Sequence, residues 1–360
     1  MVFSLQRKQR EFVILNYQSI IVTILNIEEV FMPIFFQSFS IPLAFVACFI
    51  LLKLLPGKNR ILGKDRGKKF VIGSEINKGK PTGVGIYFIV VFLLVSLSYI
   101  YDGFGMILML LTMAGAMVSG YLDDIASTPW NEYKKGALDL IVAFIGSVFF
   151  VVFYGSDVSI GFNGNSIYIH PAIYILLGSI LIIVSINSTN ATDGVDGLSG
   201  SLSIASILTI MIVSAITGNC TANGFFLGFI MIAVLSAYLM FNIFPSKMMM
   251  GDAGSRSIGF FIAFYAMYMK IPFAYLVIGL PLMLDGGLSV LKITIGRVSN
   301  KLFHKKVIIL KKVLTPVHDH LKQVKGFSAR KTWIILTTSA VVVDVAYIIL
   351  CLIVNLISKY

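Results

Sequence analysis

The sequence predicts an all-α polytopic membrane protein with about ten transmembrane helices. Two compositional observations support this. Hydrophobic residues make up 57% of the 360 residues and charged residues only 13%, whereas soluble domains carry about 25% charged residues. The mean hydropathy is +0.90. Such a composition excludes a disordered chain and does not fit an ordinary soluble enzyme.

The positions of the apolar segments are the third observation. A helix needs about 20 apolar residues to cross a hydrocarbon core of roughly 30 Å. Only Ile271-Pro272 divides the eighth segment from the ninth. We treat 1–32 as an N-terminal segment and 33–360 as a single integral membrane domain. The ten predicted spans are 34–55, 83–101, 104–122, 136–154, 171–187, 198–217, 223–243, 257–271, 273–296 and 333–357.

The charges lie mainly on one side of this arrangement. The chain has a net charge of +12, and alternate loops carry 22 of its 29 Lys and Arg residues. The positive-inside rule makes those loops cytoplasmic, so we expect a multi-pass membrane protein with these loops in the cytoplasm. Basic loops against anionic lipid explain the charge, and nucleic acid is not an expected partner. Arg7, Lys8 and Arg10 fall on the opposite side in this arrangement. The cytoplasmic loops are 56–82, 123–135, 188–197, 244–256 and 297–332.

One loop on the opposite side predicts a short external β-hairpin. Apolar residues alternate from Val158 to Phe162 and again from Ile167 to Ile169. Asn163-Gly164 lies between them, and Asn-Gly between alternating apolar residues is typical of a tight hairpin turn.

Unusual polar residues gather in the five cytoplasmic loops, which predicts a single cytoplasmic active-site cleft. Asp123 and Asp124 end one span, and Asp252 lies between two glycines. Adjacent carboxylates repel each other, which favours a nearby cation, and Mg²⁺ prefers one or two carboxylates plus substrate phosphates. The structural alternatives are a solvated helix end for the aspartate pair and a helix N-cap for Asp252.

Two further loops carry candidate binding residues. Residues 187–197 hold Asp193, Asp196 and two asparagines, without any lysine or arginine, which is odd for a connector in so basic a chain. His318 and His320 face the same way if the segment is extended. No third soft ligand lies near them, so phosphate contact or proton transfer is favoured over zinc, with a solvated surface pair as the alternative.

Four ionisable residues fall within the predicted spans. Asp285 and Lys292 are seven residues apart, which places them on one helix face as a candidate ion pair. Asp139 and Asp344 are functional candidates or helix-packing contacts. Together with the loop clusters, these features indicate phosphoryl chemistry at a membrane face, with carboxylate-held Mg²⁺ neutralising a diphosphate.

The motifs in this order resemble those of the polyprenyl-phosphate N-acetylhexosamine-1-phosphate transferases. Within that superfamily, the chain is most similar to the phospho-N-acetylmuramoyl-pentapeptide transferase family, of glycosyltransferase 4 type. The resemblance covers roughly 56–350. The segments that carry it are NSTNATDGVDGL at 187–198, FNIFPSKMMMGDAGS at 241–255 and TPVHDHL at 315–321, with weaker support from YLDD at 121–124 and KGKPTGVG at 78–85.

The resemblance implies a reaction and its residues. UDP-N-acetylmuramoyl-pentapeptide and undecaprenyl phosphate would give lipid I and UMP, with Mg²⁺ as cofactor and a homodimer as the assembly. By motif match, Asp252 would be the magnesium ligand. Asp123 and Asp124 would serve the lipid phosphate, with Asp123 a candidate base. The remaining positions would bind the donor: Asn187, Asn190, Asp193, Asp196, Asn242, His318, His320, Thr82 and Lys135.

Several positions depart from the family pattern. Asp319 replaces the middle of three histidines, Lys322 stands at a usual glutamate position, and Met249 stands where a phenylalanine usually contacts the uracil ring. One alternative is therefore the sister branch, which transfers GlcNAc-1-phosphate or a related sugar phosphate for teichoic acid or O-antigen. The segment at 258–260 and Gly326-Phe327-Ser328 resemble that branch. A non-catalytic paralogue that binds polyprenyl phosphate is a further alternative, although it would not need so many carboxylates.

Overall fold

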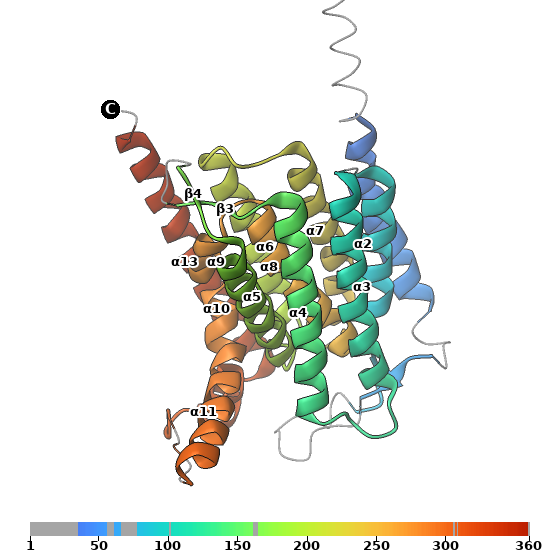
Figure 1. Ribbon diagram of the computed structural model, residues 1–360. Helices are drawn as coiled ribbons and strands as arrows, with labels where there is room; N and C mark the ends of the chain where they lie inside the picture. The colour runs from blue at the N-terminus through green and yellow to red at the C-terminus, as the bar shows by residue number, and fades with distance from the viewer. Residues whose placement is uncertain are drawn as a thin grey trace, which may run out of the picture.

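A computed structural model of the chain describes residues 35–55, 61–65, 78–100, 102–160, 165–304, 307 and 309–358. The 1–32 segment, with Arg7, Lys8 and Arg10, lies outside the described residues. The described part is a bundle of helices (Figure 1). Its main helices are Phe35–Leu54, α2 (Gly85–Tyr99), α3 (Gly103–Ile125), α4 (Glu132–Tyr154), α5 (Pro171–Thr192), α6 (Leu198–Ile216), α7 (Ala222–Asn242), α8 (Gly251–Tyr268) and α13 (Ala329–Ile357).

Shorter elements complete the chain between α8 and α13. The ninth predicted span is broken into α9 (Pro272–Ile278), α10 (Leu280–Leu282), the π-helical segment η2 (Met283–Gly287) and α11 (Leu288–Phe303). The axis bends by 55° between α9 and the helix that follows, a break that the apolar pattern did not predict. Beyond α11 lie α12 (Val317–Asp319) and the π-helical segment η3 (His320–Val324).

The all-α membrane architecture is confirmed, but the count of ten spans is not. Helix occupies each of the ten predicted ranges. By length and apolar composition, seven of the described helices could cross a membrane, or eight if the bent pair forms one span. α2 has only 15 residues, and α8, which carries Asp252 and Arg256, is not among the seven. The sidedness of the loops and the cleft also remain predictions.

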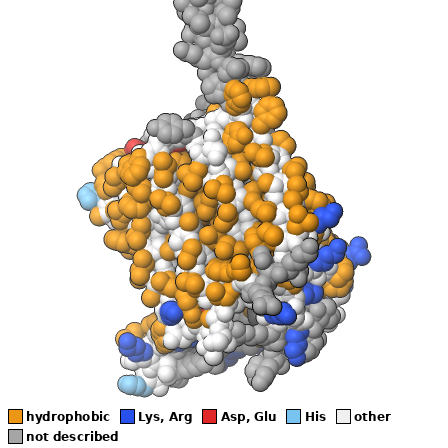
Figure 2. Space-filling view, turned by 90° about the vertical axis from the view of Figure 1, so that its right-hand side faces the viewer, with side chains coloured by type: hydrophobic (Ala, Val, Ile, Leu, Met, Phe, Trp, Pro, Cys, Tyr) orange, Lys and Arg blue, Asp and Glu red, His pale blue; other side chains and the backbone are white. Residues whose placement is uncertain are grey.

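Apolar side chains form the outer surface of the bundle. Figure 2 shows hydrophobic side chains over the middle of one face, with Lys and Arg gathered toward one end. Exposed large apolar residues occur on most helices, among them Leu94, Leu111, Phe144 and Val342. Such a surface would be unstable in water and is suited to lipid.

Two small antiparallel sheets lie at opposite ends of the bundle. β1 (Gly63–Lys64) pairs with β2 (Pro81–Thr82). β3 (Asp157–Ser159) pairs with β4 (Ser166–Tyr168), with Val158 opposite Ile167. The strands that the alternation predicts are therefore present and paired, whereas the Asn163-Gly164 turn lies outside the described residues.

The helix α8 is the centre of the bundle. Every residue from Ala253 to Tyr268 is buried, and α8 contacts α2 to α7 and α9. Glycines allow this close packing: a Cβ atom built on Gly120 of α3 would collide with the Asp252 carbonyl oxygen. One on Gly259 would lie 2.5 Å from Cα of Ile186 in α5. The close approach brings the polar start of α8 against the ends of α3 and α5.

We expect Gly259→Ala to destabilise the fold, because the added methyl group would meet the backbone of α5 rather than a movable side chain. Overpacking of this kind costs about 1–3 kcal/mol. Gly115→Ala is the matched control, since a Cβ on Gly115 of α3 meets nothing within 4 Å. Thermal unfolding in detergent would measure both variants. Equal melting temperatures for the two would show that the α5–α8 contact is not this tight.

Candidate active site

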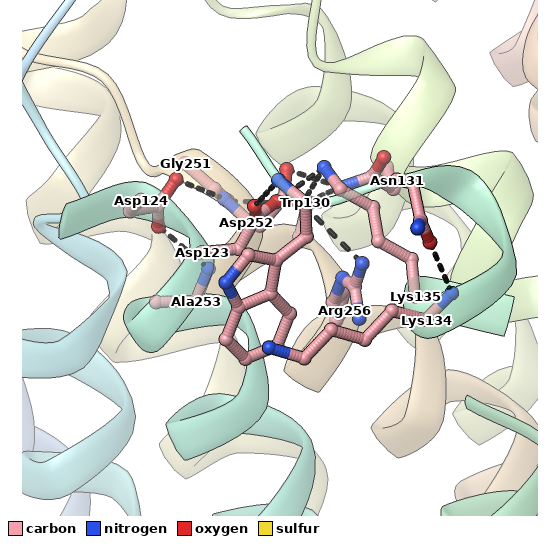
Figure 3. Close-up of polar contacts among 12 residues, drawn as sticks. Asp123, Asp124, Trp130, Asn131, Lys134, Lys135, Gly251, Asp252, Ala253 and Arg256 are labelled. Carbon is pink, nitrogen blue, oxygen red and sulfur yellow. Dashed lines mark hydrogen bonds and ion pairs between the residues drawn. The ribbon is translucent and has the colours of Figure 1, made fainter. Parts of the chain in front are cut away.

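The site begins where α3 ends against the first turn of α8. Both carboxylate oxygens of Asp124 accept backbone hydrogen bonds from that turn, from the Asp252 N–H at 3.0 Å and the Ala253 N–H at 2.9 Å. The first N–H groups of a helix have no partner within the helix, and a carboxylate is favoured there by the helix dipole. Asp124 therefore fixes the position of α8 relative to α3 (Figure 3).

Glycine makes this contact possible at Gly251. Its φ of 69° lies in the left-handed region, and a Cβ there would lie 2.5 Å from Oδ2 of Asp124 and 2.6 Å from the Gly83 amide nitrogen. The glycine spacing around Asp252 in the sequence thus has a structural cause. It brings three chain segments together at one point, rather than leaving open room for an ion.

Asp252 is the hub of the polar contacts. Its Oδ1 accepts a hydrogen bond from Asn190 Nδ2 at 2.8 Å, and its Oδ2 lies 3.0 Å from Lys135 Nζ. Arg256, one helical turn further along α8, lies 3.4 Å from Oδ2. The carboxylate is therefore contacted from α4, α5 and α8.

Lys135 joins Asp252 to Asp123. Its ammonium forms an ion pair with Oδ2 of Asp123 as well as with Asp252, and the other Asp123 oxygen accepts the Trp130 N–H at 2.8 Å. Figure 3 shows the two carboxylates and the lysine converging, with the Trp130 ring in front of them. The side chains of Lys135 and Asp252 are 27% and 20% exposed, against 5% for Asp123, so these two are more accessible to a ligand than Asp123.

Arg256 and Asp139 form a buried part of the same network. Arg256 is 2% exposed, and its NH1 lies 3.0 Å from Oδ1 of Asp139 in α4. Its Nε has no hydrogen-bond partner among the residues that the structure describes. The site prediction did not include Arg256, although its position four residues after Asp252 was a readable signal for an ion pair on one helix face. The cluster thus holds Asp123, Asp139 and Asp252 with Lys135 and Arg256.

The last turns of α5 lie beside this cluster. Asn190 donates to Asp252 and, at 2.9 Å, to Ser255 Oγ. Asn187 donates instead to the Ile183 carbonyl of its own helix at 2.9 Å. Asp196 accepts the Ser246 N–H at 3.0 Å and is 5% exposed.

Asn242 links two loops through hydrogen bonds of its side chain. Its Oδ1 accepts the Gly197 N–H, and its Nδ2 donates to the Met248 carbonyl, each at 2.9 Å. The residue is 2% exposed, so in this structure it ties the 193–197 turn to the 243–250 loop. The geometry gives no direct contact between Asn242 and the charged cluster.

His318 is also buried, at 2% exposed. Its Nδ1 lies 2.8 Å from Oδ2 of Asp285, and its backbone N–H donates to Oδ1 of Asp285 at 2.7 Å. The predicted pairing of Asp285 with Lys292 is wrong, because Asp285 pairs with His318 instead. Asp285 lies in the π-helical segment η2, whose turn differs from the α-helical spacing that the prediction assumed. Lys292 donates instead to the Val313 carbonyl at 2.9 Å.

His320 and Thr82 lie at the margin of the site. His320 is half-buried in η3 and accepts the Leu314 N–H at Nδ1, 3.3 Å away. Thr82 pairs with Gly63 in the small sheet and precedes Gly83, whose Cα lies against Asp124. Asp193 is half-buried and adjoins Gly194, which lies against the His318 ring.

The donor set fits a magnesium ion better than zinc. Among the described residues, no three His, Cys, Asp or Glu side chains are grouped as a metal site. Asp123 and Asp252 nonetheless offer carboxylate oxygens on either side of the Lys135 ammonium, which is a position that already attracts a cation. Mg²⁺ favours a coordination shell with one or two protein carboxylates, completed by phosphate oxygens of the substrate.

Comparison with known proteins identifies the family to which the chain is related. Residues 106–270 match the model of glycosyl transferase family 4. A phospho-N-acetylmuramoyl-pentapeptide-transferase of Treponema pallidum (strain Nichols) is 33% identical over 292 residues, covering 76% of this chain and 79% of that protein. One from Sulfurimonas denitrificans is 30% identical over 288 residues, covering 73% and 79%. One from Nitratiruptor sp. is 28% identical over 313 residues, covering 78% and 84%.

The matched region contains α3 to α8 and therefore Asp123, Lys135, Asn190 and Asp252. The apolar helices and these relatives together indicate a multi-pass membrane protein with a transferase site. The chain belongs to the phospho-N-acetylmuramoyl-pentapeptide-transferase family of phospho-sugar transferases, within glycosyl transferase family 4.

Proposed function

We propose that this chain transfers phospho-N-acetylmuramoyl-pentapeptide from its UDP donor to undecaprenyl phosphate, giving lipid I and UMP. The reaction would depend on Mg²⁺ and take place at the cytoplasmic face of the bacterial inner membrane. The observation that carries the proposal is the pair of carboxylates, Asp123 and Asp252, held on either side of Lys135 at the ends of packed helices. The names of the relatives support the choice of donor.

The proposed step exchanges one diphosphate linkage for another. An oxygen of the lipid phosphate attacks the β-phosphorus of the UDP-sugar and forms a new P–O bond. The bond from the β-phosphorus to the bridging oxygen breaks, and its electron pair remains on the phosphate of UMP. The sugar phosphate is now joined to the lipid phosphate, and no external energy source is needed.

Charge placement is the contribution of the protein in this step. Lys135 and Asp252 are accessible, so they would meet the donor diphosphate, while buried Arg256 holds Asp252 in place. Asp252, with Asp123 beside it, would hold the magnesium ion. When bound, that ion would neutralise the diphosphate and stabilise the departing UMP. Asp123 remains the proposed contact to the lipid phosphate and candidate base.

Asp124 is better explained as a positioning residue. Both of its oxygens are occupied by the first turn of α8, so it would act through Asp252 rather than on the lipid phosphate. Donor binding is assigned to Asn187, Asn190, Asp193, Asp196, Asn242, Thr82, His318 and His320, as the family motifs imply. For Asn242 and Asp196, the contacts support an indirect contribution through the loops that they tie together. The implied homodimer also remains a prediction.

Two departures from the family pattern lie in the proposed donor site and keep a second donor class open. Met249 is 7% exposed, and its backbone forms hydrogen bonds with Pro81 and Val84. Because it is a methionine, it offers no aromatic face to a uracil ring. Asp319 Oδ1 lies 3.8 Å from Nε2 of His318 and adds negative charge beside a proposed phosphate contact. Both features depart from the pattern of the muramoyl-pentapeptide family. UDP-GlcNAc carries the same uracil ring and diphosphate, so these contacts do not select between the two donors, and UDP-GlcNAc or a related amino-sugar donor is kept as the alternative.

UMP release with each donor separates these proposals. Purified protein in detergent would receive undecaprenyl phosphate and Mg²⁺ with either UDP-N-acetylmuramoyl-pentapeptide or UDP-GlcNAc. We expect turnover with the first donor alone. Turnover with UDP-GlcNAc alone would assign the chain to the sister branch. If folded protein, shown by cooperative melting, released no UMP with either donor, the proposed transfer would be contradicted.

Asp252→Asn should reduce UMP release about 10²–10³-fold, because removing a group that holds transition-state charge costs about 2.7–4 kcal/mol. The Asn190 contact and the fold should survive the change of one atom. Asp157→Asn, on an exposed strand residue at the opposite end of the bundle, is the control. Near-normal turnover by Asp252→Asn at saturating Mg²⁺ would rule out the assigned role.

Lys135→Gln should reduce turnover about 100-fold, since it removes the only cation contact that the described residues give Asp123 and a charge-assisted contact is worth about 1.5–3 kcal/mol. Lys134→Gln is a matched control, because its neighbouring ammonium lies over the Trp130 ring rather than between carboxylates. It should retain turnover within about threefold. Equal losses in the two variants would indicate general surface charge instead of a specific contact.

A further inference from the structure

The π-helical segment η2 holds a contact that neither the motifs nor the family names assign. Asp285 lies in η2 and is 1% exposed. One of its oxygens accepts the His318 backbone N–H and the other faces the His318 ring nitrogen Nδ1. A π-helical segment within a span often marks a functional position, and here it presents a buried carboxylate to a buried histidine.

Close packing brings Asp285 to this place. A Cβ on Gly286 would collide with the Ser188 carbonyl oxygen and lie 2.9 Å from Thr192 Oγ1. A Cβ on Gly287 would lie 2.8 Å from Ser188 Oγ. The η2 backbone therefore rests directly on the last turn of α5. This is the helix that supplies Asn190 to Asp252.

The other side of the His318 ring faces the turn between α5 and α6. A methyl group on Gly194 would collide with Nε2 and lie 2.9 Å from Cε1. Asp319 Oδ1 is 3.8 Å from Nε2. The ring thus lies between Asp285 and the turn that holds Asp193, three residues after Asn190.

We propose that Asp285 is a positioning residue for donor binding, which fixes the His318 ring so that Nε2 is directed to the α5–α6 turn and the donor diphosphate. The Asp285 carboxylate accepts a hydrogen bond from Nδ1–H and so fixes the ring orientation. When both ring nitrogens carry a proton, Nε2–H is the group that would donate to a phosphate oxygen of the donor. This inference rests on the proposed function, because it assigns His318 to the donor site of the same transfer.

A double-mutant cycle on the full chain in detergent tests the proposal. The variants are Asp285→Asn, His318→Ala and the two combined, and the probes are UDP affinity by equilibrium dialysis and the KM for each substrate. Asparagine can still accept the His318 backbone N–H. We expect Asp285→Asn to weaken UDP binding and raise the donor KM about tenfold or more, with the lipid-phosphate KM unchanged.

Non-additivity is the decisive result. If Asp285 acts through His318, the double variant should bind UDP no more weakly than His318→Ala alone. Additive losses, or an equal rise in both KM values, would overturn the proposal. Asp344→Asn is the matched control, because Asp344 is a carboxylate 4% exposed in α13. It should leave UDP affinity unchanged.

Gly194→Ala provides an independent variant if Asp285→Asn does not fold. Its methyl group would displace the ring from the Nε2 side while leaving Asp285 intact, so it should weaken UDP binding by a similar factor. Full UDP affinity in this variant would also overturn the proposal. If the wild type binds UDP but releases UMP with neither donor, the proposed function fails while the cycle can still be measured by dialysis. If the wild type turns over and the variants are unaffected, only the role of Asp285 fails.

Discussion

The structure depends on how the first turn of α8 is held. This turn is the least apolar part of a helix that is otherwise buried on every side. Asp124 accepts hydrogen bonds from two N–H groups of this turn, which have no partner within the helix. The side chain at position 252 is contacted by Asn190, Lys135 and Arg256. A helix start buried without such partners would be costly. Satisfying it therefore requires residues from α3, α4 and α5 to meet at one point.

That requirement joins the fold to the chemistry. The glycines at positions 120 and 259 let α3 and α5 approach α8 closely, and the approach places carboxylates from different helices around one lysine. Carboxylates that are fixed in advance need little rearrangement when a diphosphate enters, whereas a metal ion between Asp123 and Asp252 would take the place of the Lys135 ammonium. The same arrangement explains why a central helix can carry Asp252 and Arg256 within an apolar bundle, since both are paired.

The sequence predicts the membrane architecture and most of the cluster. Apolar segment lengths locate the helices, and the loops that carry Asp123, Lys135, Asn190 and Asp252 do come together. Asp124 could not be separated from Asp123 by sequence, because which of two adjacent carboxylates faces α8 depends on the rotation of α3. The role of Asp285 was likewise hidden, since it depends on a π-helical segment and on contact with His318, 33 residues further along the chain, and hydropathy records neither. Arg256 was readable from its spacing to Asp252.

The central claim is that Asp252, on the first turn of α8, is where a divalent cation and the donor diphosphate meet. Manganese can report this directly. When purified protein and UDP are added to Mn²⁺, binding lowers the signal of free Mn²⁺ in electron paramagnetic resonance spectra. Beyond the binding due to UDP alone, we expect the wild type to take up about one Mn²⁺ per chain and Asp252→Asn to take up none. Equal uptake by both proteins would contradict the account, because the cation would then be held elsewhere.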